Sequence, residues 1–535
     1  MRTKNSLMNI SISIMSYGII MLGGFITRGK ITKILGMDFV GLNTYFEMVV
    51  SILAIVELGL GVGIVYKLYK PIAEKQWDKV SVILCFLRRC YVFIAIIISA
   101  LALISSYSVV ASIGEDFSKI WLLKIYVLYI IDLLSSYLYS HKRSMFIADQ
   151  KSYVNNAIHI FAQLGMFASQ ILVLNLFHSF ELYLICRIVS RLAENIFISY
   201  KFNKKYSFIN LKTKENISGV EKKDLFKNMK ALLFHKISGF GTNSISVFII
   251  MKVEKLRGAG IFSNYNLIST ALTTVTSEIF NGISASFGSL LGTSDKNKIY
   301  KNFQMLYFLN FLMYSFITPT FICLITPFVI LWTGSNSIFP ISTAVSIAAY
   351  LYIYGMRQSI GMVKVSAGIY DQDKYLSLVG LFITCFSSYI LSAYLGVAGV
   401  MLGNILGMLL VPYWVQPYLV YSEVFKKKSV LLYHLKFMLY TALTAGYCFV
   451  CYEICNFVNR FEITNQVSSF IRNLLGYMHV GSNINTLFIA QIVINLTVCI
   501  FVPNIMNIII FFKTSEFRSL YVVAKSFIRR NKVKE

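Results

Sequence analysis

Three ionisable residues share one face of an apolar segment of the chain. Arg187, Arg191 and Glu194 follow one another at spacings of four and three residues, which places them on the same side of a helix. A planar guanidinium group binds phosphate oxygens in bidentate fashion, so two arginines in this pattern suit a diphosphate. The alternative is a structural role, in which Arg191 pairs with Glu194 and Arg187 bridges to another helix. The residues by themselves leave both interpretations open.

Other ionisable residues in or beside apolar segments extend the candidate site, because charge within a bilayer is costly and usually faces a cavity or a partner. The further basic candidates for binding substrate are Arg28, Lys236 and Arg357, and the acidic candidates for carrying a coupling ion, H⁺ or Na⁺, are Glu57, Asp132 and Glu278. Two alternatives remain at this stage. Arg28 is equally suited to reach lipid head groups from a helix end, and Glu57 to make a structural hydrogen bond.

The nine cysteines of the chain do not form a recognisable metal motif. Cys448, Cys451 and Cys455 share one face of a predicted helix, but no histidine or carboxylate pattern accompanies them. Cys323 and Cys499 are isolated in or beside apolar segments, as small hydrophobic residues are. The sequence therefore predicts that the cysteines pack between helices, and that the protein has no metal and no cofactor apart from a coupling ion.

The elements that position these residues are about fourteen apolar segments, each long enough to cross a hydrocarbon layer of roughly 30 Å as a helix. Apolar residues make up 56% of the chain, charged residues only 14%, and the mean hydropathy is +0.66. This composition predicts an all-α integral membrane protein. The predicted spans are 7–27, 40–66, 90–111, 120–140, 153–175, 179–200, 232–251, 258–283, 303–331, 340–363, 375–393, 396–420, 430–456 and 484–512.

The formal net charge of +26 raises the question of a nucleic-acid partner, and the placement of the basic residues answers it. Most of the 50 Lys and Arg fall in alternate gaps between the predicted spans, which is the pattern of the positive-inside rule. The densest segments are 201–231 and 513–535, which can also contact anionic lipid head groups. We therefore expect both termini in the cytoplasm, membrane lipids as partners and no nucleic-acid binding.

Two interruptions of the apolar pattern divide the chain into lobes. The predicted organisation is a six-helix lobe over 1–200, a basic cytoplasmic linker over 201–231, a second six-helix lobe over 232–425, two additional helices over 426–512, and a basic cytoplasmic tail over 513–535. Weak similarities between the halves indicate an internal repeat, which in transporters places the substrate path between the repeats. The matched segments are Glu57-Leu58-Gly59-Leu60-Gly61 with Glu278-Ile279-Phe280-Asn281-Gly282, and Gly41-Leu42-Asn43-Thr44-Tyr45 with Gly260-Ile261-Phe262-Ser263-Asn264-Tyr265.

A series of short motifs, taken in order along the whole chain, resembles the Wzx-type polysaccharide flippases of the multidrug, oligosaccharidyl-lipid and polysaccharide exporter superfamily. In that family a proline often stands where this chain has Ser359, so the chain departs from the family pattern at one position. The motifs are Arg28, Leu35-Gly36, Gly41-Leu42, Glu57-Leu58-Gly59, Tyr69-Lys70-Pro71-Ile72-Ala73, Arg357-Gln358-Ser359-Ile360, Ala367-Gly368-Ile369-Tyr370, Asp373-Lys374-Tyr375, Gly396-Val397-Ala398-Gly399-Val400 and Phe511-Phe512-Lys513-Thr514-Ser515-Glu516-Phe517.

The resemblance implies a two-lobed helical bundle in the bacterial plasma (inner) membrane. Such a protein moves an undecaprenyl-diphosphate-linked oligosaccharide to the outer leaflet by alternating access, for O-antigen, lipopolysaccharide or other surface polysaccharide biosynthesis. Partners implied by the resemblance are this lipid-linked substrate, a polysaccharide polymerase and chain-length machinery. An ion-coupled multidrug antiporter of the same fold is the alternative. A membrane polymerase is disfavoured, because the longest outer gap, 457–483, holds few residues suited to catalysis, so we do not expect an enzyme.

The orientation can be tested at the linker. With the native cysteines removed, a cysteine placed at Asn216 should resist a membrane-impermeant thiol reagent in intact cells, because the basic linker 201–231 is expected in the cytoplasm. The same cysteine should react once the cells are permeabilised. Ready labelling in intact cells would reverse the predicted topology.

Overall fold

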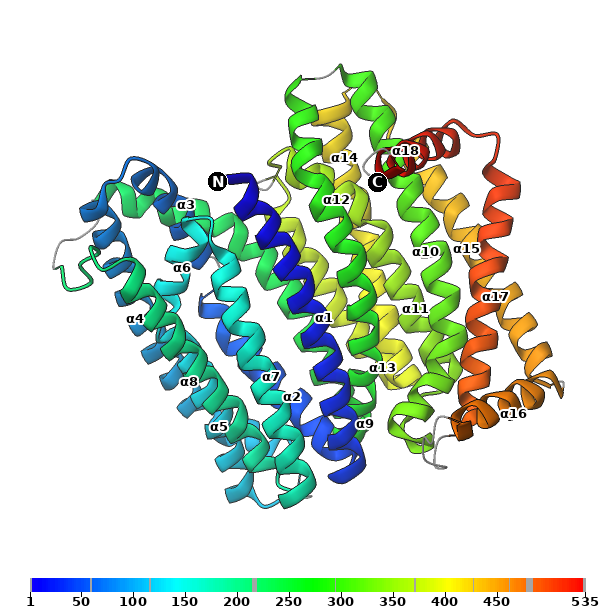
Figure 1. Ribbon diagram of the computed structural model, residues 1–535, viewed down its shortest axis with the longest axis horizontal. Coiled ribbons are helices and arrows are strands. Elements are labelled where there is room, and N and C mark those ends of the chain that lie inside the picture. Colours follow the sequence, from blue (N-terminus) through cyan, green and yellow to red (C-terminus); the bar gives the residue numbers. More distant parts are fainter. Residues whose placement is uncertain are drawn as a thin grey trace. The chain divides into compact units, whose positions relative to one another are not determined.

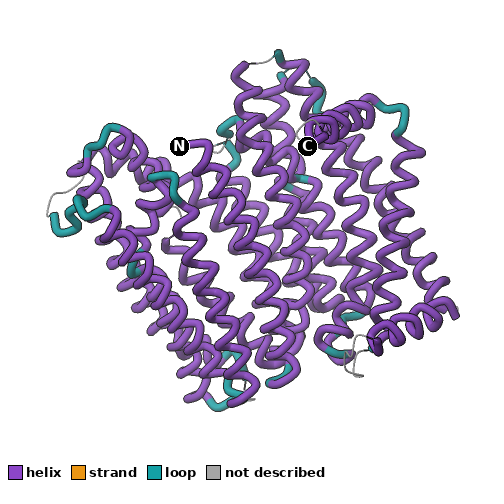
Figure 2. The backbone as a smooth tube through the Cα atoms, viewed as in Figure 1, coloured by secondary structure: helices purple, strands orange, loops and turns teal. Residues whose placement is uncertain are grey.

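The computed structural model describes residues 2–57, 60–114, 117–213, 219–293, 295–369, 372–426, 428–460, 462–477 and 485–532. Helices make up nearly all of this part of the chain, and it contains no strand (Figure 2). Eight helical segments within it are long and apolar enough to cross a membrane. The protein is therefore an all-α, multi-pass membrane protein, and the predicted number of about fourteen spans stays a prediction. Asn216 lies outside the described residues.

The chain divides into two compact units, Met1–Gly260 and Ile261–Glu535. The first unit contains, in order, α1 (Arg2–Ile34), α2 (Met37–Leu53), η1 (Ala54–Glu57), α3 (Leu60–Ala73), α4 (Trp77–Ala111), α5 (Lys119–Tyr137), α6 (Ser140–Ala148), α7 (Ser152–Phe177), α8 (Phe180–Lys205) and the larger part of α9 (Gly219–Thr293). The α-helices are labelled in Figure 1. Within this unit α7 packs between α1 and α8, while α5 packs against α2, α4 and α8.

The second unit contains the remainder of α9 and the elements that follow it in the chain. They are α10 (Lys296–Thr333), η2 (Ser335–Ser337), α11 (Ile341–Met356), α12 (Gln358–Ser366), α13 (Lys374–Leu410), α14 (Pro412–Val420), η3 (Tyr421–Phe425), α15 (Leu431–Arg460), α16 (Glu462–Tyr477), α17 (Thr486–Phe511) and α18 (Ser515–Lys532). Here α10 packs against α11, α15 and α17. The lobe boundaries predicted from the sequence remain predictions.

Two of the long helices are broken where the sequence predicts a gap between spans. Lys255 has φ 56° within α9, and Gly396 has φ 56° within α13, so each element consists of two helices joined at a sharp turn. The segment predicted as one span over 40–66 contains more than one kind of helix, because α2 ends at Leu53 and the 3-10 turn η1 covers Ala54–Glu57. Apolar composition continues through this change, so hydropathy alone did not detect it.

Glycines allow α2 and α9 to approach closely within the first unit. A Cβ atom at Gly41 would lie 1.9 Å from the carbonyl oxygen of Leu256, and one at Gly260 would lie 2.6 Å from that of Met37. No side chain fits at either position, since carbon and oxygen atoms do not approach so closely. These two glycines head the matched segments that indicated a repeat. Tyr45 and Tyr265, later in the same segments, are both buried.

Aromatic side chains fill helix interfaces of the second unit. Phe311 of α10 stacks on Tyr440 of α15 with ring centroids 4.1 Å apart, and Tyr307 stacks on Tyr433 at 4.8 Å. Phe511 at the end of α17 contacts Phe311 at 5.5 Å. Stacked and edge-to-face contacts of this kind add to the stability that burial provides.

An ion pair connects α18 to α15 within the second unit. Lys436 Nζ of α15 lies 2.6 Å from Glu516 Oε1 at the start of α18, and 2.5 Å from Gln304 Oε1 of α10. Burial alone would raise the pKa of the Glu516 carboxyl, but the hydrogen bond and charge of Lys436 outweigh it and hold that pKa below its ordinary value.

Glu516→Gln should lower the free energy of unfolding of the purified protein at pH 7 by about 1–2 kcal/mol, the usual size of a charge-assisted hydrogen bond. The lowered pKa means that the pair stabilises the fold above the ordinary carboxyl pKa of 4.5 and ceases to do so as the pH falls through the folded-state pKa. The difference in melting temperature between wild type and variant should therefore shrink in acid. Arg518→Gln, an exposed change on the same helix, serves as the control and should show no such pH dependence.

Candidate functional site

The candidate site is a cluster of charges in the first unit, built on three helices. Asp132 of α5 is buried, with a side chain that is 7% exposed, and both of its oxygens bind arginine. Arg191 Nε lies 2.6 Å from Oδ1, and Arg187 Nε lies 2.9 Å from Oδ2. Arg187 also reaches α2, where its Nη1 lies 3.0 Å from Glu47 Oε1. Two carboxylates thus neutralise two guanidinium groups.

The arginines keep part of their surface accessible while the aspartate does not. The side chains of Arg187 and Arg191 are 22% and 28% exposed, and that of Glu47 is 43% exposed. The Tyr129 ring lies against the guanidinium group of Arg187, whose central carbon is 5.6 Å from the ring centre. The Tyr129 hydroxyl in turn donates to Asn43 Oδ1 over 2.5 Å. The cluster therefore has a buried anion, two half-buried cations and one accessible anion.

Glu194 belongs to a neighbouring network instead of pairing with Arg191. Its Oε1 lies 3.2 Å from Arg143 Nη2 of α6, and its Oε2 lies 3.2 Å from His159 Nδ1 of α7. The sequence-based pairing of Arg191 with Glu194 is wrong, because Asp132 offers Arg191 a bidentate partner on a facing helix. The other half of that interpretation, in which Arg187 bridges to another helix, is confirmed.

Glu57 and Lys236, two further candidates in the first unit, interact with each other electrostatically. Glu57 ends η1 and accepts a hydrogen bond from the Tyr91 hydroxyl over 3.3 Å. Lys236 lies in α9 and is half-buried, as is Arg28 in α1. A hydrogen-bonded Glu57 agrees with the structural alternative from the sequence, and it does not test the ion-coupling role.

The remaining candidates, Glu278 and Arg357, lie in the second unit. Glu278 of α9 is exposed and accepts a 3.4 Å hydrogen bond from Asn281. Arg357 stands between α11 and α12, where its Nη2 donates to Gln416 Oε1 of α14 over 3.1 Å. Its buried Nε has no hydrogen-bond partner among the described residues. The helix is interrupted at Arg357 although no proline follows it.

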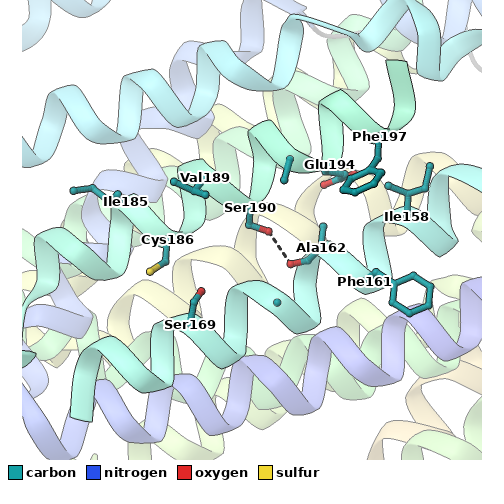
Figure 3. A pocket seen from close by; sticks show the side chains of 12 residues that line it. Ile158, Phe161, Ala162, Ser169, Ile185, Cys186, Val189, Ser190, Glu194 and Phe197 are labelled. Atoms are coloured by element: carbon teal, nitrogen blue, oxygen red, sulfur yellow. Dashed lines mark hydrogen bonds between the residues drawn. The ribbon is translucent and has the colours of Figure 1, made fainter. Parts of the chain in front are cut away.

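A groove of about 630 Å³ opens between α7 and α8 on the first unit. Its lining is almost entirely apolar and includes Phe161, Val189 and Phe197, with the Glu194 carboxylate at one end (Figure 3). The Ser190 hydroxyl on its wall already donates to the carbonyl oxygen of Ala162 over 2.7 Å. Such a lining suits a hydrocarbon chain and offers nothing to a diphosphate.

The sequence did not predict the roles of Glu47 and Tyr129 in the charge cluster, or that of Arg143 beside Glu194. The role of Glu47 could have been inferred from the sequence, because Glu47 lies in an apolar segment and a carboxylate there needs a partner. Arg143 was not distinguishable from other basic residues of a predicted inner gap. Its place in α6 beside Glu194 depends on the packing of α6 against α7 and α8.

The sequence matches no protein-family model and no curated protein. Three solved structures do share its fold. An inward-facing multidrug resistance MATE family transporter of the MOP superfamily superposes with a TM-score of 0.57 and 14% identity over 76% of this chain and 94% of that one. The lipid II flippase MurJ, in an inward closed conformation, gives 0.57 and 14% over 93% of this chain and 99% of that one. A MATE transporter from Vibrio cholerae, VcmN, gives 0.55 and 11% over 80% and 99%.

At these levels of identity the comparisons show the fold alone. The chain has the all-helical membrane fold that these MATE transporters and the lipid II flippase share.

The pairing within the cluster can be tested by double-mutant cycles on the purified protein. Asp132→Asn should destabilise the fold by about 3 kcal/mol, because it leaves buried arginine charge without its carboxylate. Adding Arg191→Gln should recover part of that loss, which would appear as a coupling energy between the two positions. The matched cycle with Glu194→Gln and Arg191→Gln should show little coupling. Stronger coupling at Glu194 than at Asp132 would contradict the described geometry.

Proposed function

We propose that this protein is a flippase that carries a polyprenyl-diphosphate-linked oligosaccharide, such as the undecaprenyl-linked form, across the bacterial plasma membrane by alternating access. The observation that carries the proposal is the arginine pair of the charge cluster, Arg187 and Arg191, within a transport fold. Their guanidinium groups are partly exposed and present the planar donors that phosphate oxygens accept in bidentate fashion.

The charge balance of the cluster supports binding of an anion by exchange. Asp132 is buried between the two arginines and holds them in place, whereas Glu47 is accessible and has a single arginine contact. A diphosphate that approaches Arg187 would replace Glu47 and leave the Asp132 contacts intact. Binding would then replace the partly exposed Glu47–Arg187 ion pair by stronger bonds to a group of higher charge.

The extent of the fold similarity also favours a lipid-linked substrate. The similarity to the lipid II flippase extends over 93% of this chain, against 76% and 80% for the two MATE transporters. The apolar groove between α7 and α8 provides a surface for hydrocarbon in the same unit as the arginines. We propose that the sugar and diphosphate use the polar cluster while the polyprenyl chain stays among lipids and apolar side chains.

A multidrug antiporter of the same fold is the second candidate. The carboxylates Glu47, Glu57 and Asp132 favour it, since acidic groups suit cationic substrates and coupling ions. We retain Glu57, Asp132 and Glu278 as proposed carriers of H⁺ or Na⁺. Both termini are proposed to lie in the cytoplasm, and a polysaccharide polymerase and chain-length proteins are proposed partners in surface polysaccharide synthesis.

The substrate class can be tested in vesicles that contain the purified protein and a fluorescent undecaprenyl-diphosphate-linked oligosaccharide. Arg28→Ala and Arg191→Ala should reduce the flipping rate at least tenfold at unchanged protein levels, because a phosphate-binding cation is lost. Arg191→Lys should recover flipping only in part, since an ammonium group cannot form the bidentate contact. Lys124→Ala removes an exposed cation paired with Glu181 and serves as the control. Export of cationic drugs by a protein that does not flip the lipid would favour the antiporter.

A further inference from the structure

Four cysteines meet inside the second unit although the sequence separates them widely. Cys323 lies on α10, Cys451 and Cys455 on α15, and Cys499 on α17. All four are buried, with exposed fractions between 0% and 6%. The sulfur atoms of Cys323, Cys455 and Cys499 lie within 4.8 Å of one another. Packing of three helices thus produces a compact group of thiols, which the isolated positions of these cysteines in the sequence did not indicate.

Hydrogen bonds between the same three helices hold this group in register. Asn495 of α17 donates from Nδ2 to the carbonyl oxygen of Cys323 on α10 over 2.9 Å. Asn459 of α15 donates to Asn495 Oδ1 over 3.1 Å. Both asparagines stand about one helical turn from a cysteine on their own helix, so they limit the sliding of α10, α15 and α17 past each other. The thiols therefore sit on rigid elements, which is what a preorganised site requires.

The chemistry of the group is that of a site for a soft metal ion. Its four cysteines offer sulfur donors, and the partly buried hydrophobic residues packed against it are Tyr452, Val498 and Val502. Sulfur ligands in apolar surroundings select soft ions such as Cu(I) over ions that prefer oxygen. A metal–sulfur bond of about 2.3 Å places sulfur atoms about 4.0 Å apart in a trigonal site and about 3.8 Å apart in a tetrahedral one. Small side-chain rotations bring the described sulfurs to such separations.

We propose that Cys323, Cys451, Cys455 and Cys499 form a binding site for one Cu(I) ion that joins α10, α15 and α17. When the ion binds, one thiol passes its proton to water and its thiolate bonds to Cu(I), and the other sulfurs form further Cu–S bonds by donating a lone pair each as neutral thiols. The complex is then uncharged, as the apolar surroundings require. A divalent ion needs two thiolates for the same neutrality, which makes Zn(II) the less favourable occupant. The site is independent of the proposed transport function.

The test measures metal retained by the intact purified protein. The detergent-solubilised chain is incubated with Cu(I) under reducing, oxygen-free conditions with excess glutathione, so that isolated cysteines do not compete, and is then desalted and assayed for copper. The wild type should retain one ion per chain and show a higher melting temperature with Cu(I), because binding to the folded state stabilises it. Cys499→Ser should retain none and show no shift.

Cys385→Ser is the matched control, because Cys385 lies on α13 of the same unit and is not a member of the cluster, and it should behave like wild type. If Cys499→Ser fails to fold, Cys455→Ala removes another of the three close sulfurs and should give the same loss. Equal copper in wild type and in the cluster variants would overturn the proposal. So would retention of Zn(II) in preference to Cu(I), or retention of neither ion, in which case the cysteines only pack the helices together.

Discussion

The low polarity of a bilayer makes an unpartnered charge so costly that the buried carboxylate of Asp132 determines the arrangement around it. Asp132 lies on α5, and its carboxylate accepts a bidentate contact from Arg191 and a further contact from Arg187, both on α8. Arg187 also pairs with Glu47 of α2. These ion pairs join three helices, and the formal charges of the two arginines and the two carboxylates sum to zero. Removal of any one member leaves an opposite charge uncompensated, so the members depend on each other.

The same arrangement separates the parts that hold the fold from the part that is free to exchange. Asp132 is enclosed, while Glu47 is exposed over almost half of its side chain. In the proposed function, an anionic ligand competes with Glu47 for Arg187 and leaves the Asp132 contacts in place. This division would suit the proposed polar substrate, because the cost of burying the arginines is met before any ligand arrives. Arg357, whose described polar contact is a neutral amide, follows a different pattern in the second unit.

Close packing carries the rest of the fold. Glycines 41 and 260 bring helix backbones together at distances that exclude any side chain, and aromatic rings fill the wider interfaces of the second unit. Helices in lipid gain no hydrophobic advantage from contact with each other, so small residues, ring stacking and hydrogen bonds between helices decide which pairs associate. The cysteine group on α10, α15 and α17 is one product of such packing.

The amino-acid sequence by itself determined the helical membrane architecture. The length of an apolar segment and its lack of charge are local properties, and they decide whether the segment is stable in a bilayer as a helix. It also identified Asp132, Arg187 and Arg191 as residues in need of partners. Which partners they have was decided only by the tertiary structure, since Arg191 selects Asp132 on another helix over Glu194 on its own. The meeting of Cys323 with Cys499 has the same origin. Contacts between residues distant in the chain depend on how helices face one another, and helical periodicity alone does not specify that.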